Sequence, residues 1–310
     1  MGCRMYSLLK SDQVRIFEVG PRDGLQNEKR FVPTETKLSL IHQLSQTGLK
    51  HIEATSFVSP KWVPQMADAT QVYKGLVKTK GVVYPVLVPN VKGMESALEV
   101  KADEVAVFCA ASEAFSQKNI NCSIQQSLDR FIPVIQMAQK NNIPIRGYVS
   151  TVIGCPYAGD IDPKAVASVA ERLNALGCYE VSLGDTIGVG NPLKIKRLIE
   201  TVSLVVPLDR LAVHFHDTYG QAIANILKAL EMGIRVVDSS VAGLGGCPYA
   251  KGATGNVATE DVVYLAQGLG LHTGVDLPTL AKVGNYISKQ LHRPNGSKTG
   301  LALVRKLGLE

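Results

Sequence analysis

The chain has 310 residues, of which 45% are hydrophobic and 19% are charged, and this balance excludes a disordered chain. The length allows two or three domains or one large α/β barrel. The formal net charge of +6 permits binding to nucleic acid but does not require it.

Short runs rich in β-branched residues alternate with helix-length amphipathic segments. The first strand is predicted at 14–19, and Pro33 then opens a helix that ends at about Gln46, before Gly48. Further strands are predicted at 51–55, 82–88, 104–108, 144–150, 179–183, 211–216 and 236–241. Further helices are predicted at 123–140, from 162, from 192, at 219–232 and at 259–267. This alternation of strands and helices favours an α/β fold, a parallel sheet closed into a (β/α)8 TIM barrel.

The chain contains no linker rich in glycine, serine or proline that would divide it. We therefore assign residues 1–270 to the barrel, as the catalytic domain, and residues 271–310 to a helical extension packed on the barrel. In such barrels the chemistry collects at the C-terminal ends of the strands. The predicted strand ends carry these polar residues: Glu18, Arg22, Asp23, Glu53, Ser56, Asp185, His214, His216 and Asn256.

The pair His214 and His216 is the most informative feature of the sequence. Alternate residues of a strand face the same side, so both imidazoles can point into the mouth of the barrel. Two imidazoles with carboxylate and amide oxygens nearby suit an octahedral divalent ion. The following residue, Asp217, is interpreted as a helix cap rather than as a ligand.

The residues at the end of the first strand allow two readings. Arg22 and Asp23 form either a surface ion pair in a turn or a carboxylate ligand beside a fixed cation that could hold an oxyanion. Glu53 lies in a strand, where a buried carboxylate needs a partner, and Arg22 is the expected one. Asn256 is either a helix N-cap or a ligand.

Cys247 follows three glycines within residues 243–246. The segment is either a flexible connector with an unremarkable cysteine or a mobile loop whose thiol exchanges a proton above the site. None of the six cysteines forms a Cys-x-x-Cys pair, and the N-terminus carries neither a secretory signal nor an apolar run that could span a membrane. We therefore expect reduced thiols, a cytoplasmic location and no membrane partner.

Several other function classes lack their motifs. The sequence contains no dinucleotide-binding glycine motif after a strand, no P-loop and no Gly-x-Ser-x-Gly. Aromatic residues make up only 6% of the chain and do not alternate with basic residues, so a nucleic-acid partner is not expected.

Three segments of the chain resemble one enzyme family. Residues 19–28, VGPRDGLQNE, resemble the opening of metal-dependent lyases and condensing enzymes that share an Asp-Arg-Glu site on a barrel. Residues 240–249, SVAGLGGCPY, are similar to the cysteine loop of the 3-hydroxy-3-methylglutaryl-CoA lyases, and residues 253–261, ATGNVATED, continue the match. The likeness spans about residues 14–269, with no departure at a motif position.

The resemblance implies cleavage of 3-hydroxy-3-methylglutaryl-CoA into acetyl-CoA and acetoacetate, as in leucine degradation and ketone-body formation. It implies Mg²⁺ or Mn²⁺ as the cofactor, with the following ligands: Asp23, His214, His216 and Asn256. It places Arg22 at the thioester carbonyl, Cys247 in proton transfer, and Asp185 and Glu53 as supporting acids. Because coenzyme A carries phosphates, polar residues near strand ends or in loops are expected contacts of the acyl-CoA: Lys29, Ser56, Asn119 and Ser182.

The implied reaction is a retro-Claisen cleavage. A base removes the proton of a tertiary alcohol, a step that a divalent metal eases, and the cleavage leaves an enolate that Arg22 can hold. His214, Asp23 and Asp185 all remain candidates for the base. The alternatives are an acyl-CoA condensing enzyme or a related aldolase-type lyase of the same superfamily, and a basic binding protein without catalysis. We expect a homodimer or another homo-oligomer.

Overall fold

A computed structural model describes residues 12–28, 30–246 and 255–309. Its centre is one sheet in which every strand pairing is parallel. In chain order the strands are β1 (Arg15–Glu18), β2 (His51–Ile52), β3 (Thr55–Ser56), β4 (Pro85–Leu87), β5 (Glu104–Ala110), β6 (Ile145–Ser150), β9 (Glu180–Asp185), β10 (Leu211–Phe215) and β11 (Val236–Ser239). Because parallel neighbours need long crossovers, a helix returns the chain after most strands.

The sheet closes through the segment between β2 and β3. These two short strands stand at opposite ends of the strand order, with β2 beside β1 and β3 beside β4. They are halves of one predicted strand, interrupted at Glu53 and Ala54. The Glu53 amide donates to the Glu18 carbonyl at 2.8 Å, and the Ala54 amide donates to the Pro85 carbonyl at 2.9 Å. The interrupted strand therefore bridges β1 and β4, and the predicted eight-stranded barrel is confirmed.

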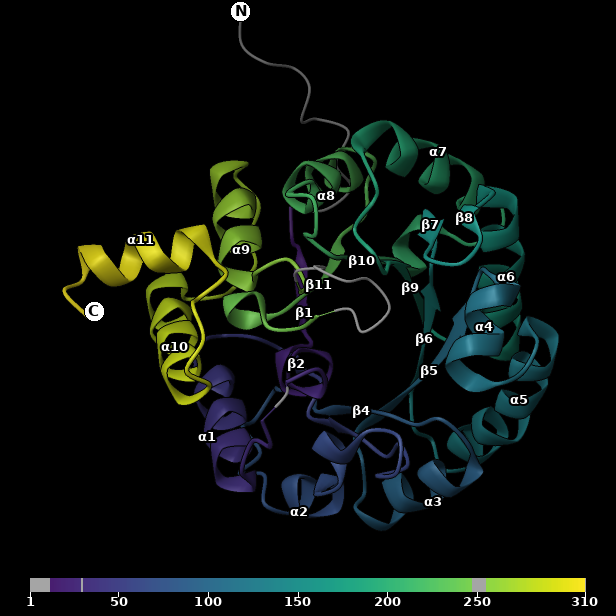
Figure 1. Ribbon diagram of the computed structural model, residues 1–310, viewed down its shortest axis with the longest axis horizontal. Helices are drawn as coiled ribbons and strands as arrows, with labels where there is room; N and C mark the ends of the chain where they lie inside the picture. Colours follow the sequence, from purple (N-terminus) through teal and green to yellow (C-terminus); the bar gives the residue numbers. More distant parts are fainter. Residues whose placement is uncertain (1–11, 29, 247–254, 310) are drawn as a thin grey trace, which may run out of the picture.

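Helices surround the strands as an outer ring (Figure 1). They are α1 (Thr34–Ser45), α2 (Ala69–Lys74), α3 (Val91–Glu99), α4 (Glu113–Ile120), α5 (Ile124–Lys140), α6 (Pro163–Leu176), α7 (Pro192–Val202), α8 (Ala222–Glu231) and α9 (Thr259–Gly268). Side-chain caps fix several predicted starts. Ser123 and Gln126 form a capping box at α5, and the Asn191 side chain accepts hydrogen bonds from two amides of α7.

The structure adds elements that the pattern did not predict. The short helices α2 and α3 and the helix α4 lie in segments read as connections. A small antiparallel pair, β7 (Gly154–Cys155) and β8 (Gly159–Asp160), follows β6. The helix predicted from residue 219 begins at Ala222, because Gly220 has a φ of 68° and holds a turn instead.

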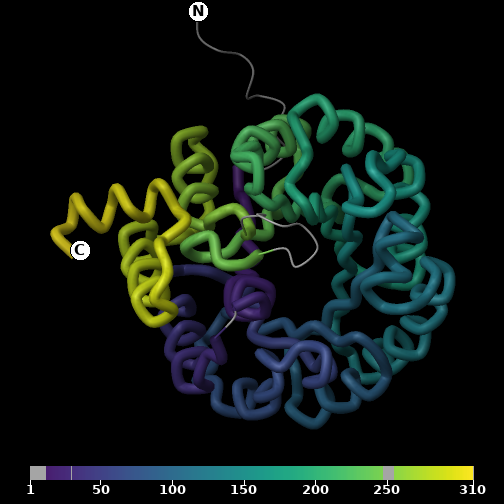
Figure 2. Tube along the Cα trace, viewed as in Figure 1, coloured from purple at the N-terminus to yellow at the C-terminus, as the bar shows by residue number. Residues whose placement is uncertain are grey.

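Two helices follow the barrel, α10 (Leu277–Gln290) and α11 (Lys298–Lys306). Figure 2 shows α10 beside α1, so the last part of the chain returns to the first, and α11 packs against α9 and α10. The division at residue 270 stays a prediction. Among the described residues, none of the helices combines the length and the apolar character that a membrane span requires.

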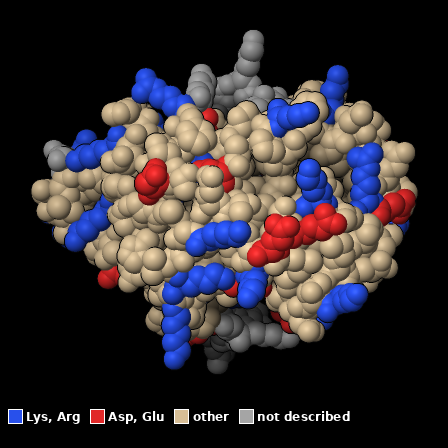
Figure 3. Space-filling view, turned by 90° about the horizontal axis from the view of Figure 1, so that it is seen from below, with Lys and Arg blue, Asp and Glu red and all other residues tan. Residues whose placement is uncertain are grey.

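The surface charge is interspersed on the face drawn in Figure 3. Lys and Arg side chains lie there beside Asp and Glu side chains, rather than in one continuous basic patch.

The interior of the barrel contains charged side chains as well as apolar ones. Arg146, Glu180 and Asp238 are buried among the strands, and Arg146 is completely inaccessible. A buried charge is tolerated only where it is paired, so these groups have to be connected to one another.

Candidate functional site

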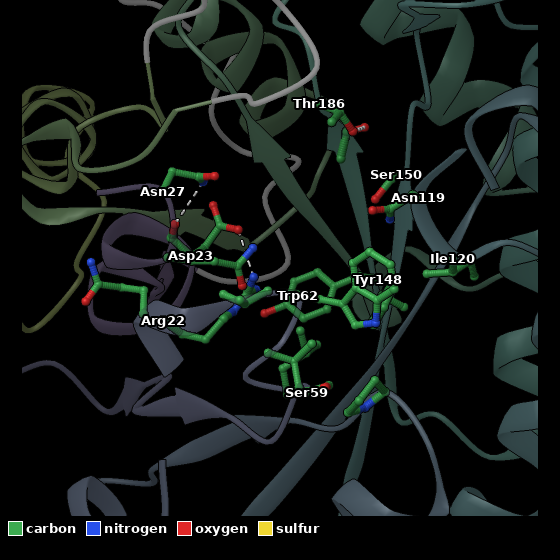
Figure 4. A pocket seen from close by; sticks show the side chains of 18 of the residues that line it. Arg22, Asp23, Asn27, Ser59, Trp62, Asn119, Ile120, Tyr148, Ser150 and Thr186 are labelled. Atoms are coloured by element: carbon green, nitrogen blue, oxygen red, sulfur yellow. Dashed lines mark hydrogen bonds and ion pairs between the residues drawn. The ribbon is translucent and has the colours of Figure 1, made fainter. Parts of the chain in front are cut away.

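A cavity of about 1050 Å³ opens at the C-terminal ends of the strands. Figure 4 shows Arg22, Asp23 and Asn27 on one side of it and Asn119, Ile120 and Ser150 on the other. His214 and His216 also line it. The cavity therefore lies where the parallel strands predicted that chemistry would collect.

A tight turn presents the first two site residues. The helical turn Gly20–Gly24 follows β1 directly. A Cβ at Gly24 would lie 2.8 Å from the Leu244 Cβ and 2.8 Å from the Ser240 Oγ. Only glycine permits this close approach to the end of β11, which fixes Arg22 and Asp23 at the rim of the cavity.

Arg22 is held on two sides by carboxylates. Its Nε donates to the Glu53 Oε2 at 2.6 Å, and its NH1 donates to the Asp23 Oδ1 at 2.7 Å. The predicted pairing of Arg22 with Glu53 is confirmed. Burial alone would lower the pKa of Arg22, but Glu53 and Asp23 outweigh it and raise the pKa above its usual value. The guanidinium is therefore a permanent, oriented cation beside the cavity.

Asp23, His214 and His216 form a cluster that could hold a metal ion. One ligand atom from each lies within 4.8 Å of the others, and the Nε2 of His214 is 4.0 Å from the Oδ2 of Asp23. The two imidazole rings are 5.5 Å apart. The alternation along β10 thus brings the rings together as predicted.

The donor set fits a divalent cation. The Nδ1 of His216 is buried and has no hydrogen-bond partner among the described residues. Burial acts to raise the pKa of Asp23, but Arg22, the two histidines and Asn256 together lower it to about 2. Burial, followed by His214, lowers the pKa of His216 to about 4. Near neutral pH the carboxylate is therefore charged and His216 neutral, which are the forms that bind metals.

Asn256 lies against this cluster. Its Nδ2 donates to the Asp23 Oδ2 at 2.8 Å and to the Leu244 carbonyl at 3.2 Å. A backbone bridge pairs Asn256 with His216. Of the two readings of Asn256, the N-cap is wrong, because α9 begins at Thr259 with Ala258 as its cap.

Other predicted residues support the walls of the site. The Asp185 carboxylate accepts hydrogen bonds from the amides of Val189 and Gly190, at 3.2 and 2.7 Å, and holds the turn after β9. Burial raises the pKa of Asp185. The N-cap of α8 is Gln221, so the prediction that Asp217 is the cap residue is wrong, although its carboxylate accepts from the Ala222 amide at 2.9 Å.

The predicted acyl-CoA contacts lie at different depths. Asn119, on α4, lines the cavity. Ser56 and Ser182 are buried in β3 and β9, and their hydroxyls donate to the Leu87 carbonyl at 3.4 Å and to the Asp238 Oδ2 at 2.7 Å. Lys29 and Cys247 lie outside the described residues.

Sequence reasoning missed two residues next to the cluster. Tyr148 lines the cavity, and its ring meets the His214 ring edge-on at 6.2 Å. Asp238, in β11, contacts His214 from behind the cavity. A signal for Asp238 was present: a single carboxylate inside the buried run 236–239 demands a partner. Tyr148 carries no such signal, because tyrosine is common in buried strands.

Comparison with known proteins agrees with the motifs. The HMGL-like family model matches residues 13–287. A Pseudomonas aeruginosa relative named 3-hydroxy-3-isohexenylglutaryl-CoA/hydroxy-methylglutaryl-CoA lyase is 60% identical over 294 residues, covering 95% of this chain and 98% of the relative. A Rattus norvegicus relative named 3-hydroxy-3-methylglutaryl-CoA lyase, cytoplasmic, is 59% identical over 291 residues, covering 94% of this chain and 85% of the relative.

A solved structure is equally similar. The crystal structure of hydroxymethylglutaryl-CoA lyase from Pseudomonas aeruginosa matches with a TM-score of 0.94 and 59% identity, covering 96% of this chain and 99% of that one. The family model covers most of the chain, and the relatives match over nearly their whole lengths. The chain therefore belongs to the HMGL-like family.

Proposed function

We propose that this protein is a carbon–carbon lyase that cleaves 3-hydroxy-3-methylglutaryl-CoA into acetyl-CoA and acetoacetate. The observation that carries the proposal is the convergence of Asp23, His214 and His216 beside the fixed guanidinium of Arg22 in one large cavity. Relatives that share almost the whole chain bear the name of this activity.

The reaction needs a base, an anion holder and an acid. The base takes the proton of the tertiary alcohol, the bond between the second and third carbons of the acyl group breaks, and the electron pair passes to the departing acetyl-CoA enolate. Arg22 holds the enolate oxygen, because a rigid cation stabilises charge that develops in the transition state. An acid then protonates the enolate carbon.

His214 and Asp23 line the cavity and are the proposed candidates for the base. Asp185 and Glu53 have supporting roles, because the first holds a turn and the second orients Arg22. Cys247 is the proposed acid. Its role rests on the three glycines before it and on the resemblance of its segment to the cysteine loop.

Asp23, His214, His216 and Asn256 would hold Mg²⁺ or Mn²⁺. Carboxylate and amide oxygens with imidazole suit these ions better than a structural zinc, which favours thiolates. When bound, the ion supplies positive charge that eases loss of the alcohol proton.

The remaining proposals concern the substrate contacts, the cellular location, the metabolic role and the oligomeric state. Lys29 and Asn119 are proposed contacts of the acyl-CoA. Ser56 and Ser182 were predicted as contacts, but both side chains are fully buried and neither lines the cavity. A cytoplasmic location and a role in leucine degradation and ketone-body formation are also proposals, supported by the rat relative that is named cytoplasmic and by the product acetoacetate. We also propose that the protein forms a homo-oligomer and has neither a nucleic-acid nor a membrane partner.

The test is an assay for acetoacetate from 3-hydroxy-3-methylglutaryl-CoA. We expect activity to disappear after exhaustive chelation and to return with Mg²⁺ or Mn²⁺. Full turnover of metal-free protein would overturn the metal assignment. In a parallel assay with acetyl-CoA and candidate oxo acids, a thiol reagent detects free CoA, which a condensing enzyme releases and the lyase does not.

A further inference from the structure

We infer that Asp238 is a positioning residue for His214: from behind the cavity it fixes the ring so that Nε2 faces the Asp23 carboxylate and the metal cluster. Asp238 lies in the middle of β11 and is buried with 1% exposure. This inference rests on the proposed function, because it concerns the ligand geometry of the proposed metal centre.

The contacts of His214 define its orientation. Its Nδ1 lies 3.3 Å from the Asp238 Oδ2, and its Nε2 lies 4.0 Å from the Asp23 Oδ2 on the opposite side. A carboxylate can only accept, so the proton belongs on Nδ1 and Nε2 keeps its lone pair. The edge-on contact with Tyr148 limits rotation of the same ring. Metal-ligating histidines commonly donate their other ring N–H to a carboxylate in this way.

Asp238 is itself held by a fork of hydrogen bonds. Arg146 donates to both of its oxygens, at 2.6 and 3.0 Å, and the Ser182 hydroxyl donates to Oδ2 at 2.7 Å. These three charge-assisted or hydroxyl hydrogen bonds hold the carboxylate in one orientation, with Oδ2 toward His214.

Arg146 is held by a second carboxylate, that of Glu180. The Nε of Arg146 donates to the Glu180 Oε1 at 2.8 Å, and its guanidinium carbon lies 4.0 Å from the centre of the Phe17 ring. Glu180 is also paired with Arg15. The buried charges thus form one connected series from Glu180 through Arg146 and Asp238 to His214, which explains why the barrel interior contains them.

The test is the affinity of the purified protein for Mn²⁺, followed by the electron paramagnetic resonance signal of free Mn²⁺. Asp238→Asn keeps the shape but directs an amide N–H₂ toward either Arg146 or His214. We expect its dissociation constant for Mn²⁺ to rise about 10- to 100-fold, the usual cost of losing such a partner. The matched control is Glu104→Gln, which changes a buried carboxylate of β5 that accepts from the Tyr179 hydroxyl at 2.8 Å. Its dissociation constant should stay within about 2-fold of that of the parent, because Glu104 pairs with Tyr179 rather than with a proposed metal ligand. A purely structural role of Asp238 would instead change both variants alike.

A second measurement needs no variant that might fail to fold. In parent protein labelled with ¹⁵N-histidine and free of metal, we expect the neutral His214 ring to carry its proton on Nδ1. A proton on Nε2, or unchanged Mn²⁺ affinity in Asp238→Asn, would overturn the positioning role. Failure of the parent protein to bind Mn²⁺ would instead refute the metal centre itself, so the two failures are distinguishable.

Discussion

Single residues of this site act through neighbours that fix their geometry. Arg22 is 6% exposed and is bonded to two carboxylates, so its guanidinium has one orientation. A side chain held in this way does not have to reorient when charge develops during the reaction, which is the basis of electrostatic catalysis.

Substitution of Arg22 by lysine tests this role. Lysine keeps the positive charge but lacks the planar fork that meets Glu53 and Asp23 together. If Arg22 stabilises charge that exists only during reaction, kcat should fall by about 10²- to 10³-fold with little change in KM. Steady-state kinetics check this, and a near-normal kcat with a raised KM would make Arg22 a substrate anchor instead.

Alkylation should distinguish Cys247 from the described cysteines. Cys109, Cys122, Cys155 and Cys178 are buried and free, and burial raises the pKa of Cys109 to about 11. The Cys109 thiol therefore contains little thiolate, and burial limits the access of a reagent to all four. We expect iodoacetamide to inactivate the enzyme through Cys247, and bound product to protect it.

A mass-spectrometric map of modified cysteines against residual activity checks this prediction. Cys247→Ser should keep the fold and lose most turnover, because a hydroxyl of high pKa is a poor proton donor. Inactivation that follows Cys3, Cys122 or Cys155, or normal turnover of the serine variant, would remove Cys247 from the chemistry.

At the scale of elements, the site depends on how closely the turn after β1 approaches the end of β11. Gly24 allows contact with Leu244 and Ser240, and Asn27 in turn donates to the Gly246 carbonyl at 3.2 Å. Two connections far apart in the sequence therefore become one rigid rim. Asp23 reaches His214 in β10 and His216 just after it because this rim holds it there.

Gly24→Ala should break this contact. An added methyl group would lie 2.8 Å from two atoms, so the turn has to move, at a cost of about 1–3 kcal/mol. Affinity for Mn²⁺ should fall with it, because Asp23 is the next residue. Gly268→Ala is the matched control: it lies in α9 with nothing within 4 Å, and should be neutral or stabilising by up to about 1 kcal/mol. Chemical denaturation measures both, and equal stability of the two variants would contradict the packing argument.

At the scale of the whole molecule, two buried acids connect the first strand with the last part of the barrel. Glu18 of β1 accepts hydrogen bonds from the Val241 amide at 2.9 Å and from the Thr259 hydroxyl at 2.6 Å. Glu260 of α9 accepts from the Ala242 amide at 3.0 and 3.1 Å. Both acids thus support the segment that leads from β11 toward Cys247.

These acids should make stability depend on pH. Burial is the main cause that raises the pKa of Glu18 to about 7 and of Glu260 to about 8, from 4.5. The folded state then holds protons that the unfolded chain has released, so the contribution of these two groups to the free energy of unfolding is fully present below about pH 4.5 and is lost as the pH rises toward 7–8. Each group contributes a slope of about 1.4 kcal/mol per pH unit in that window.

Glu260→Gln should remove the contribution of Glu260 to the pH dependence of the free energy of unfolding and leave that of Glu18. Urea denaturation at a series of pH values measures it, with Glu171→Gln on the exposed face of α6 as the control. The control should reproduce the slope of the parent protein. An unchanged slope in Glu260→Gln would show that the carboxyl does not keep its proton in the folded state.

The sequence by itself determined the order of the barrel strands, the closure into a barrel and the pairing of the two histidines, because each rests on a short-range rule. Strand alternation places His214 and His216 on one face, and cap residues such as Asn191 fix the helix starts. The motifs at residues 19–28 and 240–249 identified the family for the same reason, since they are contiguous in the chain.

Only the tertiary structure decided which distant residues meet. The interruption of one strand at Glu53, the contact of Gly24 with Leu244 and the connection from Arg146 through Asp238 to His214 join segments 24 to 220 positions apart. A pattern of hydrophobic residues shows that a buried charge needs a partner, but the partner is chosen by barrel closure and register. Those are properties of the whole sheet, and no local stretch of sequence contains them.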